Sequence, residues 1–176
     1  NDLEISNVFE IAIAQSTLRS IIGEGEAALL NNGEWIGSLD EIKRTSGYWI
    51  EFDDYNYRDF NMIGIETQCE ETVYDLHWGK NLVSYVGPDG VSLDDAIPEE
   101  FDSDIIESIQ GASEAGLNMG GLGWVGSLDT VYKNAGYWLD VKQSGGIEFY
   151  WNCGEEDISS RSLNISEGTS SSFFDL

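Results

Sequence analysis

The sequence has few basic residues and a single histidine, and each shortage narrows the classes of function. Eight lysine and arginine residues are outnumbered by 33 aspartate and glutamate residues, which gives a formal net charge of −25. Affinity for nucleic acid depends on basic side chains that release counterions from the phosphate backbone, so nucleic acid is a poor partner. Anionic membrane surfaces are disfavoured for the same reason. No apolar run approaches the roughly 20 residues that span a bilayer, so we expect no membrane insertion.

The excess of acidic residues has two interpretations. A solvated acidic surface suits salty water, where charges more than about 8–10 Å apart are screened from one another. Alternatively, the carboxylates bind divalent cations. Both interpretations favour a marine, halophilic or extracellular setting.

The shortage of histidine also disfavours catalysis. Serine or cysteine nucleophiles need a base, His77 is the sole histidine, and the sequence has no Gly-x-Ser-x-Gly element. Paired carboxylates suffice for glycoside hydrolysis when they lie about 5–9 Å apart, but no acidic pair here stands in a distinctive motif. We therefore expect that the protein is not an enzyme and keep a carboxylate-based hydrolase as the third-ranked alternative.

The dominant feature of the sequence is an internal repeat. Trp35–Asp40 recurs as Trp124–Asp129, and Gly47–Ile50 recurs as Gly136–Leu139, in both cases 89 positions later. Such a fixed spacing predicts a tandem duplication, and the whole architecture follows from it.

The pattern within one copy predicts helix and strand. Residues 48–52 and 137–141 alternate apolar with polar side chains, which is typical of half-buried strands. We expect further strands at 60–69, 81–86 and 147–153. Apolar residues that recur about every four positions predict an amphipathic helix in each copy: Leu93, Ile97, Phe101, Ile105 and Ile109 in the second, and Ile5, Phe9, Ile13, Leu18 and Ile22 in the first.

These elements predict a sheet-rich α+β fold. We expect two tandem copies of a strand-helix-hairpin-strand module, related by a pseudo-twofold axis and packed as one compact unit. The first module covers residues 1–75 and the second covers 76–167. Gly168 follows Gly79 by 89 positions, so we expect the C-terminal strand at 168–176 to complete the first module.

The repeat resembles a module of large secreted and cell-surface proteins of environmental, often marine, bacteria and archaea, with relatives in phage. The resemblance lies in Asn81–Tyr85, in Gly123–Leu128 and in Gly136–Trp138, which match a Gly-Trp-Asn-Leu-Ile-Ser strand followed further on by Gly-Tyr-Trp. It implies an extracellular, modular and non-catalytic role, and it carries no ligand residues.

The tryptophans divide into two groups. Trp35, Trp49, Trp124 and Trp138 occur in both copies, so we expect them to anchor the core, with a sugar-stacking platform as the alternative. Trp78 and Trp151 have no repeat partner and are the candidates for an exposed, ligand-binding aromatic.

One acidic loop is present in only the first copy. Its oxygen-bearing side chains are candidate calcium ligands, although a solvated loop is the alternative: Asp53, Asp54, Asn56 and Asp59. We expect no required cofactor beyond this candidate calcium.

The two cysteines, Cys69 and Cys153, are predicted to end equivalent strands of the two copies. Positions that are equivalent near a twofold axis can meet, and an oxidising exterior favours a disulfide between them. Two buried free thiols are the alternative.

The leading functional hypothesis is a non-catalytic, extracellular structural or adhesion module of a larger surface or virion-appendage protein. Its expected partners are a protein or glycan at a cell or virion surface, a second copy of the chain, or neighbouring domains of the same polypeptide. The alternative is a carbohydrate-binding module, calcium-dependent if the acidic loop holds the ion.

Overall fold

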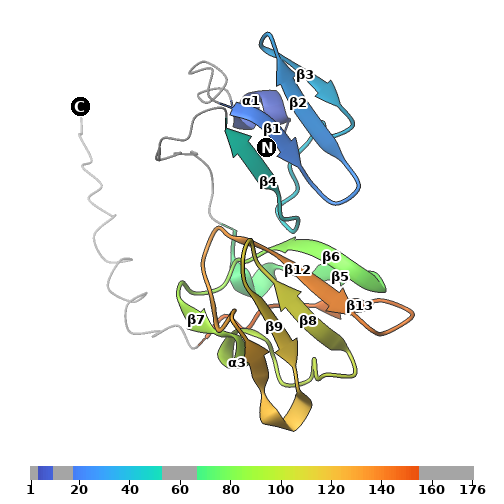
Figure 1. Ribbon diagram of the computed structural model, residues 1–176, viewed down its shortest axis with the longest axis vertical. Coiled ribbons are helices and arrows are strands. Elements are labelled where there is room, and N and C mark those ends of the chain that lie inside the picture. The colour runs from blue at the N-terminus through green and yellow to red at the C-terminus, as the bar shows by residue number, and fades with distance from the viewer. Residues whose placement is uncertain (1–3, 10–17, 53–66, 155–176) are drawn as a thin grey trace, which may run out of the picture.

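Two antiparallel sheets dominate the computed structural model, which describes residues 4–9, 18–52 and 67–154 (Figure 1). The first sheet has the order β3-β2-β1-β4 and consists of β1 (Leu18–Ile22), β2 (Ala27–Asn31), β3 (Glu34–Gly37) and β4 (Trp49–Phe52). The second has the order β10-β9-β8-β12-β6 and consists of β6 (Gly79–Ser84), β8 (Ile106–Gln110), β9 (Ala115–Asn118), β10 (Trp124–Gly126) and β12 (Gly136–Val141).

The remaining elements are short. Two two-stranded sheets pair β5 (Tyr74–Leu76) with β13 (Ile147–Phe149) and β7 (Val91–Ser92) with β11 (Thr130–Val131). The helices are single turns, namely α1 (Ile5–Val8), α3 (Leu93–Ala96) and the 3-10 turns η1 (Cys69–Glu71) and η2 (Gly120–Leu122). The described chain is therefore sheet-rich, as the sequence predicted.

Each large sheet has its own hydrophobic core. The first core is formed by Ile5, Phe9, Leu18, Ile21, Ala28 and Leu39. The second is larger and centres on aromatic residues, among them Tyr74, Tyr85, Phe149 and Trp151. Strand β5 packs into this second core, although the predicted module boundary at residue 75 would place Tyr74 in the first module and Leu76 in the second.

The same serine contact occurs in both sheets. The backbone N–H of Ser38 donates to the carbonyl oxygen of Ala27 at 2.8 Å, and Ser127 donates to Ala115 at 2.9 Å. Each serine Oγ accepts the N–H of the same alanine in return, at 3.3 and 3.1 Å. These paired bonds close the turn that follows β3 and β10, which explains why serine stands at both positions.

The glycine before each serine is required by a close backbone approach. A Cβ on Gly37 would lie 2.1 Å from the carbonyl oxygen of Ala27, and a Cβ on Gly126 would lie 2.1 Å from that of Ala115. No side chain fits at such a distance, so both positions require glycine.

Tyrosine, rather than tryptophan, anchors the repeated Gly-Tyr-Trp element. The hydroxyls of Tyr48 and Tyr137 accept the backbone N–H of Lys43 and Tyr132, each at 2.9 Å. Neighbouring strand residues point to opposite faces, so the tryptophans that follow point away from the cores.

The prediction that all four repeated tryptophans are core residues is therefore wrong for two of them. Trp49 is 40% exposed, and neither Trp49 nor Trp138 belongs to a core cluster. Trp35 and Trp124, which stand on β3 and β10, do pack against the first and second cores.

The predicted long helix before Gly111 is wrong. Ser92 caps the N-terminus of helix α3, where its Oγ accepts the N–H of Asp95 at 3.2 Å. The helix ends at Ala96, because Pro98 disfavours a helical conformation at Ile97. The residues beyond it form β8, in which Ile106 and Ile109 are both fully buried.

A β-bulge produced the helix-like spacing. The pairing of β8 with β12 shifts register between Asp140 and Val141, which leaves Glu107 as an extra residue and turns Ile106 and Ile109 to one face. The pairing of β1 with β4 shifts at Arg19 in the same way. Apolar residues three positions apart therefore share a face of a strand here.

Cys69 and Cys153 form a disulfide, with their Cα atoms 5.7 Å apart. Cys69 lies in η1, just before β5, and Cys153 lies just after β13, the strand that pairs with β5. The bond thus links the two strands of one small sheet beyond the end at which Tyr74 pairs with Phe149, and the prediction that the cysteines end equivalent strands is wrong. The predicted strand at 147–153 is formed only at Ile147–Phe149.

Three predictions fall outside the described residues. They are the acidic loop with Asp53, Asp54, Asn56 and Asp59, most of the strand at 60–69, and the closing strand at 168–176.

Replacing Gly126 with alanine should destabilise the second sheet. The added methyl group would meet the carbonyl oxygen of Ala115 at 2.1 Å, and backbone atoms can move apart only by weakening the β9–β10 pairing. We expect the free energy of unfolding to fall by about 2–3 kcal/mol in urea denaturation. Gly121→Ala is the control, because a Cβ there meets no atom within 4 Å. Equal stability of the two variants would contradict the close approach.

Removing the disulfide should lower stability because the bond closes a loop with a sequence separation of 84. The chain-entropy model gives about 4–5 kcal/mol for a loop of this length. We expect the Cys69→Ser, Cys153→Ser double variant to unfold at a correspondingly lower urea concentration. An unchanged midpoint would show that the unfolded chain is already restricted without the bond.

Candidate functional site: the junction between the two sheets

Strand β6 is the meeting point of the two sheets. On one edge it pairs with β12, from Gly136 opposite Ser84 to Val141 opposite Gly79. On the other edge it contacts residues 45–47, which precede β4 of the first sheet (Figure 1). The N–H of Gly47 donates to the Leu82 carbonyl at 2.9 Å, and the N–H of Ser84 donates to the Thr45 carbonyl at 3.3 Å.

The two repeated glycines approach each other beside this strand. A Cβ on Gly136 would lie 3.2 Å from the Cα atom of Gly47, and a Cβ on Gly47 would lie 2.8 Å from the Val83 carbonyl oxygen. Both Gly-Tyr-Trp elements therefore flank β6, and their glycines allow the two halves to pack at backbone distance.

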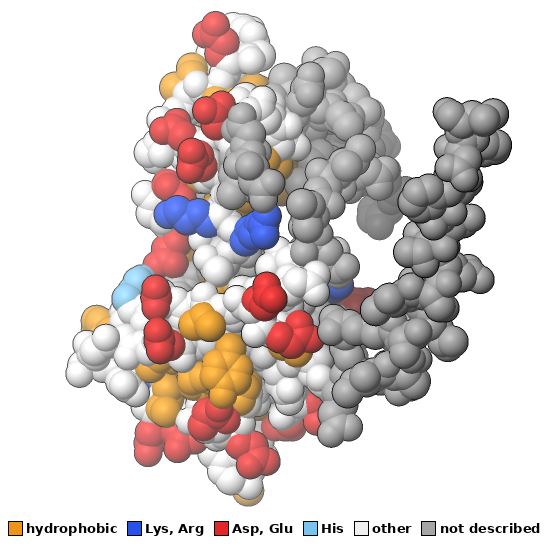
Figure 2. All heavy atoms as spheres, turned by 180° about the vertical axis from the view of Figure 1, so that it is seen from behind, with side chains coloured by type: hydrophobic (Ala, Val, Ile, Leu, Met, Phe, Trp, Pro, Cys, Tyr) orange, Lys and Arg blue, Asp and Glu red, His pale blue; other side chains and the backbone are white. Residues whose placement is uncertain are grey.

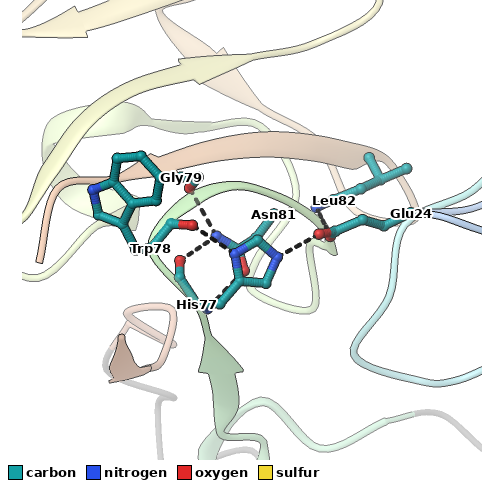
Figure 3. Close-up of polar contacts among 6 residues, drawn as sticks. All are labelled: Glu24, His77, Trp78, Gly79, Asn81 and Leu82. Atoms are coloured by element: carbon teal, nitrogen blue, oxygen red, sulfur yellow. Dashed lines mark hydrogen bonds and ion pairs between the residues drawn. The ribbon is translucent and has the colours of Figure 1, made fainter. Parts of the chain in front are cut away.

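Glu24 extends the contact along the same edge of β6. Its Oε2 accepts the backbone N–H of Leu82 at 2.8 Å, and its Oε1 lies 2.6 Å from Nε2 of His77 (Figure 3). Glu24 comes from the turn between β1 and β2, so one carboxylate of the first sheet binds two groups of the second.

The partners of His77 favour its protonated form. Its Nδ1 lies 2.7 Å from the carbonyl oxygen of Trp78, and its Nε2 lies 2.6 Å from Oε1 of Glu24. Protonation gives the imidazole a donor at each ring nitrogen, so each of these oxygens then accepts a hydrogen bond. The hydrogen bond to the Trp78 carbonyl, followed by the bond to Glu24, raises the pKa of His77 above its ordinary value.

Asn81 fixes the turn that presents His77. Its side chain is buried, its Oδ1 accepts the N–H of His77 at 2.9 Å, and its Nδ2 donates to the carbonyls of His77 and Gly79, each at 2.9 Å. Gly79 closes the turn with a φ of +92°. The backbone turn that Asn81 and Gly79 fix therefore places the imidazole of His77 next to Glu24.

The two tryptophan candidates have opposite environments. Trp78 is 66% exposed, and Figure 3 shows its indole pointing away from the Glu24–His77 pair. Trp151 is 1% exposed, donates Nε1–H to the Ser84 carbonyl at 2.9 Å and packs edge-on against Tyr85 and Phe149. The prediction of an exposed Trp151 is wrong. Phe149 and Trp151 stand two positions apart, and this strand-like spacing was the signal in the sequence that their side chains share a buried face.

A pocket of about 290 Å³ opens beside the junction. Its first wall is Tyr48 and Trp49, and its second wall comes from the β8–β9 turn, Gly111–Glu114, and from Thr130 and Tyr132. Sequence reasoning missed this pocket because it assigned Trp49 to the core. Tyr132 was the available signal, since the corresponding position of the first copy is Lys43.

Acidic side chains are spread over both halves of the molecule on the face drawn in Figure 2. Among the described residues, no three His, Cys, Asp or Glu side chains are grouped to hold a metal ion. Within residues 4–9, 18–52 and 67–154, no helix has the length and apolar character needed to cross a membrane.

Comparison of the chain with protein-family models, with curated proteins and with solved structures gave no match.

The Glu24–His77 contact should make stability depend on pH. Because the pKa of His77 is raised in the folded protein, its contribution is complete below the unfolded value of about 6.5 and is lost as pH rises through the folded value. We expect the melting temperature of the wild type relative to His77→Gln to decrease across that range. Glu24→Gln should reduce the pH dependence of the difference, because the hydrogen bond to the Trp78 carbonyl remains, whereas Glu26→Gln, which leaves Glu24 in place, should retain it in full. A pH-independent difference would contradict the raised pKa of His77.

Proposed function

We propose that the protein is a non-catalytic, extracellular structural or adhesion module of a larger surface or virion-appendage protein. The observation that carries this proposal is the junction, in which residues 45–47 of the first half pair with β6 of the second. Backbone pairing between consecutive units produces a stiff connection, which suits a polypeptide that extends from a surface.

We further propose that the two sheets are tandem copies of one module. The strand order β3-β2-β1-β4 has its counterpart in β10-β9-β8-β12. The serine bonds, the glycine contacts and the bulges recur at corresponding positions. In this proposal, residues 168–176 supply the first copy with a counterpart of β6.

An extracellular location is supported by two independent features. The Cys69–Cys153 disulfide is of a kind that persists in oxidising compartments. The net charge of −25 favours a solvated surface in salty water, where self-repulsion is screened. The resemblance to repeats of secreted marine proteins points the same way.

The location is tested on intact cells or particles that carry the parent polypeptide. A membrane-impermeant amine reagent should label its lysines, and differential alkylation with mass spectrometry should find Cys69 and Cys153 oxidised before lysis. A cytoplasmic protein of the same sample must stay unlabelled, as the control. Protection from the reagent together with free thiols would contradict the proposal. Turnover of a substrate that is lost on mutation of a carboxylate pair would contradict the non-catalytic assignment.

A further inference from the structure

We propose that the pocket at the junction binds a neutral saccharide, with Trp49 and Tyr132 as its stacking surfaces. The inference rests on the adhesive role proposed above and names the class of ligand for it. The pocket has walls from both halves, so it exists only when the junction is formed.

The two aromatic side chains are exposed on backbone that is held in place. Trp49 stands on β4 opposite Ile22 of β1 and is 40% exposed, while Tyr132 is 54% exposed. The backbone N–H of Tyr132 donates to the Tyr137 hydroxyl at 2.9 Å, and its carbonyl accepts the N–H of Ala135 at 3.2 Å. Tryptophan and tyrosine have only two side-chain torsions, so they bind at low entropic cost, and their apolar faces match the C–H face of a pyranose.

The remaining lining supplies hydrogen-bonding groups suited to sugar hydroxyls. Ser113 and Thr130 bring hydroxyls, which both donate and accept, and Glu114 brings a carboxylate, which accepts. The described residues that line the pocket include no lysine, arginine or histidine. A carboxylated or sulfated sugar would meet the charge of Glu114 unopposed, so the chemistry favours a neutral ligand.

The fold does not dictate the residues that distinguish this pocket. The backbone N–H of Tyr132 donates to a tyrosine hydroxyl, and Lys43 makes the same bond at the corresponding position of the first copy. This bond needs no particular side chain at either position. Ser113 likewise corresponds to Gly25 in the first copy. The tyrosine ring and the serine hydroxyl are therefore additions to a scaffold that forms without them.

The volume limits the size of the ligand. A pocket of about 290 Å³ lies just below the range of roughly 300–1,000 Å³ that small-ligand sites occupy. It suits the end of a glycan rather than an extended stretch of a polysaccharide.

The test is a calorimetric and tryptophan-fluorescence titration of the full chain with a panel of neutral oligosaccharides: maltohexaose, cellohexaose, xylohexaose, mannohexaose and chitohexaose. We expect at least one to bind, and Trp49→Ala and Tyr132→Lys each to weaken that binding by about tenfold or more. Tyr132→Lys installs the residue that the first copy carries at this position, so the variant should fold. Trp78→Ala, which removes an exposed tryptophan outside the pocket lining, should bind as the wild type does.

Four outcomes would overturn the inference. Three are no binding of any oligosaccharide at millimolar concentration, equal binding by the wild type and Tyr132→Lys, and binding that is lost in Trp78→Ala but kept in Trp49→Ala. The fourth is binding that EDTA abolishes and Trp49→Ala leaves intact, because the ligand would then sit at a metal elsewhere. None of these results bears on the surface-labelling experiment, so the proposed location stands or falls separately.

Discussion

The architecture depends on one strand, β6, which forms hydrogen bonds along both of its edges. On one side β12 pairs with β6 from Gly79 to Ser84. On the other side residues 45–47 and the Glu24 carboxylate form hydrogen bonds with the backbone groups of β6 that β12 does not reach. Each half has its own core, so burial alone does not place one half against the other. The directional hydrogen bonds along β6 place the two halves against each other, and they also bring the walls of the pocket together.

The sequence was informative where residues are fixed by local geometry. The strands at 48–52 and 137–141 were predicted by alternation, and the structure has β4 and β12 there. The helix prediction failed because a bulge gives a strand the three-residue spacing of a helix, and periodicity alone does not separate the two. The β-branched Ile105, Ile106 and Ile109 favour a strand and were the better guide.

The candidate site was predicted only in part. Repetition identifies residues that both copies need, but it does not tell the buried side chain from its exposed neighbour: in Gly-Tyr-Trp the tyrosine is the anchor and Trp49 is exposed. Trp78 was singled out by lacking a partner, and so was Trp151, which the structure buries. The pocket was missed because Trp49 was assigned to the core, and because its walls come from residues more than 60 positions apart that meet only through β6.

The carboxylate of Glu24 has a consequence for solubility. An open strand edge presents unpaired N–H and C=O groups that recruit strands of other molecules and start aggregation. Glu24 and residues 45–47 occupy those groups at Leu82 and Ser84, and a bound carboxylate cannot be extended by another strand as a backbone can. The first half thus covers this strand edge of the second, and a chain cut before Gln68 would expose the edge of β6 to strands of other molecules.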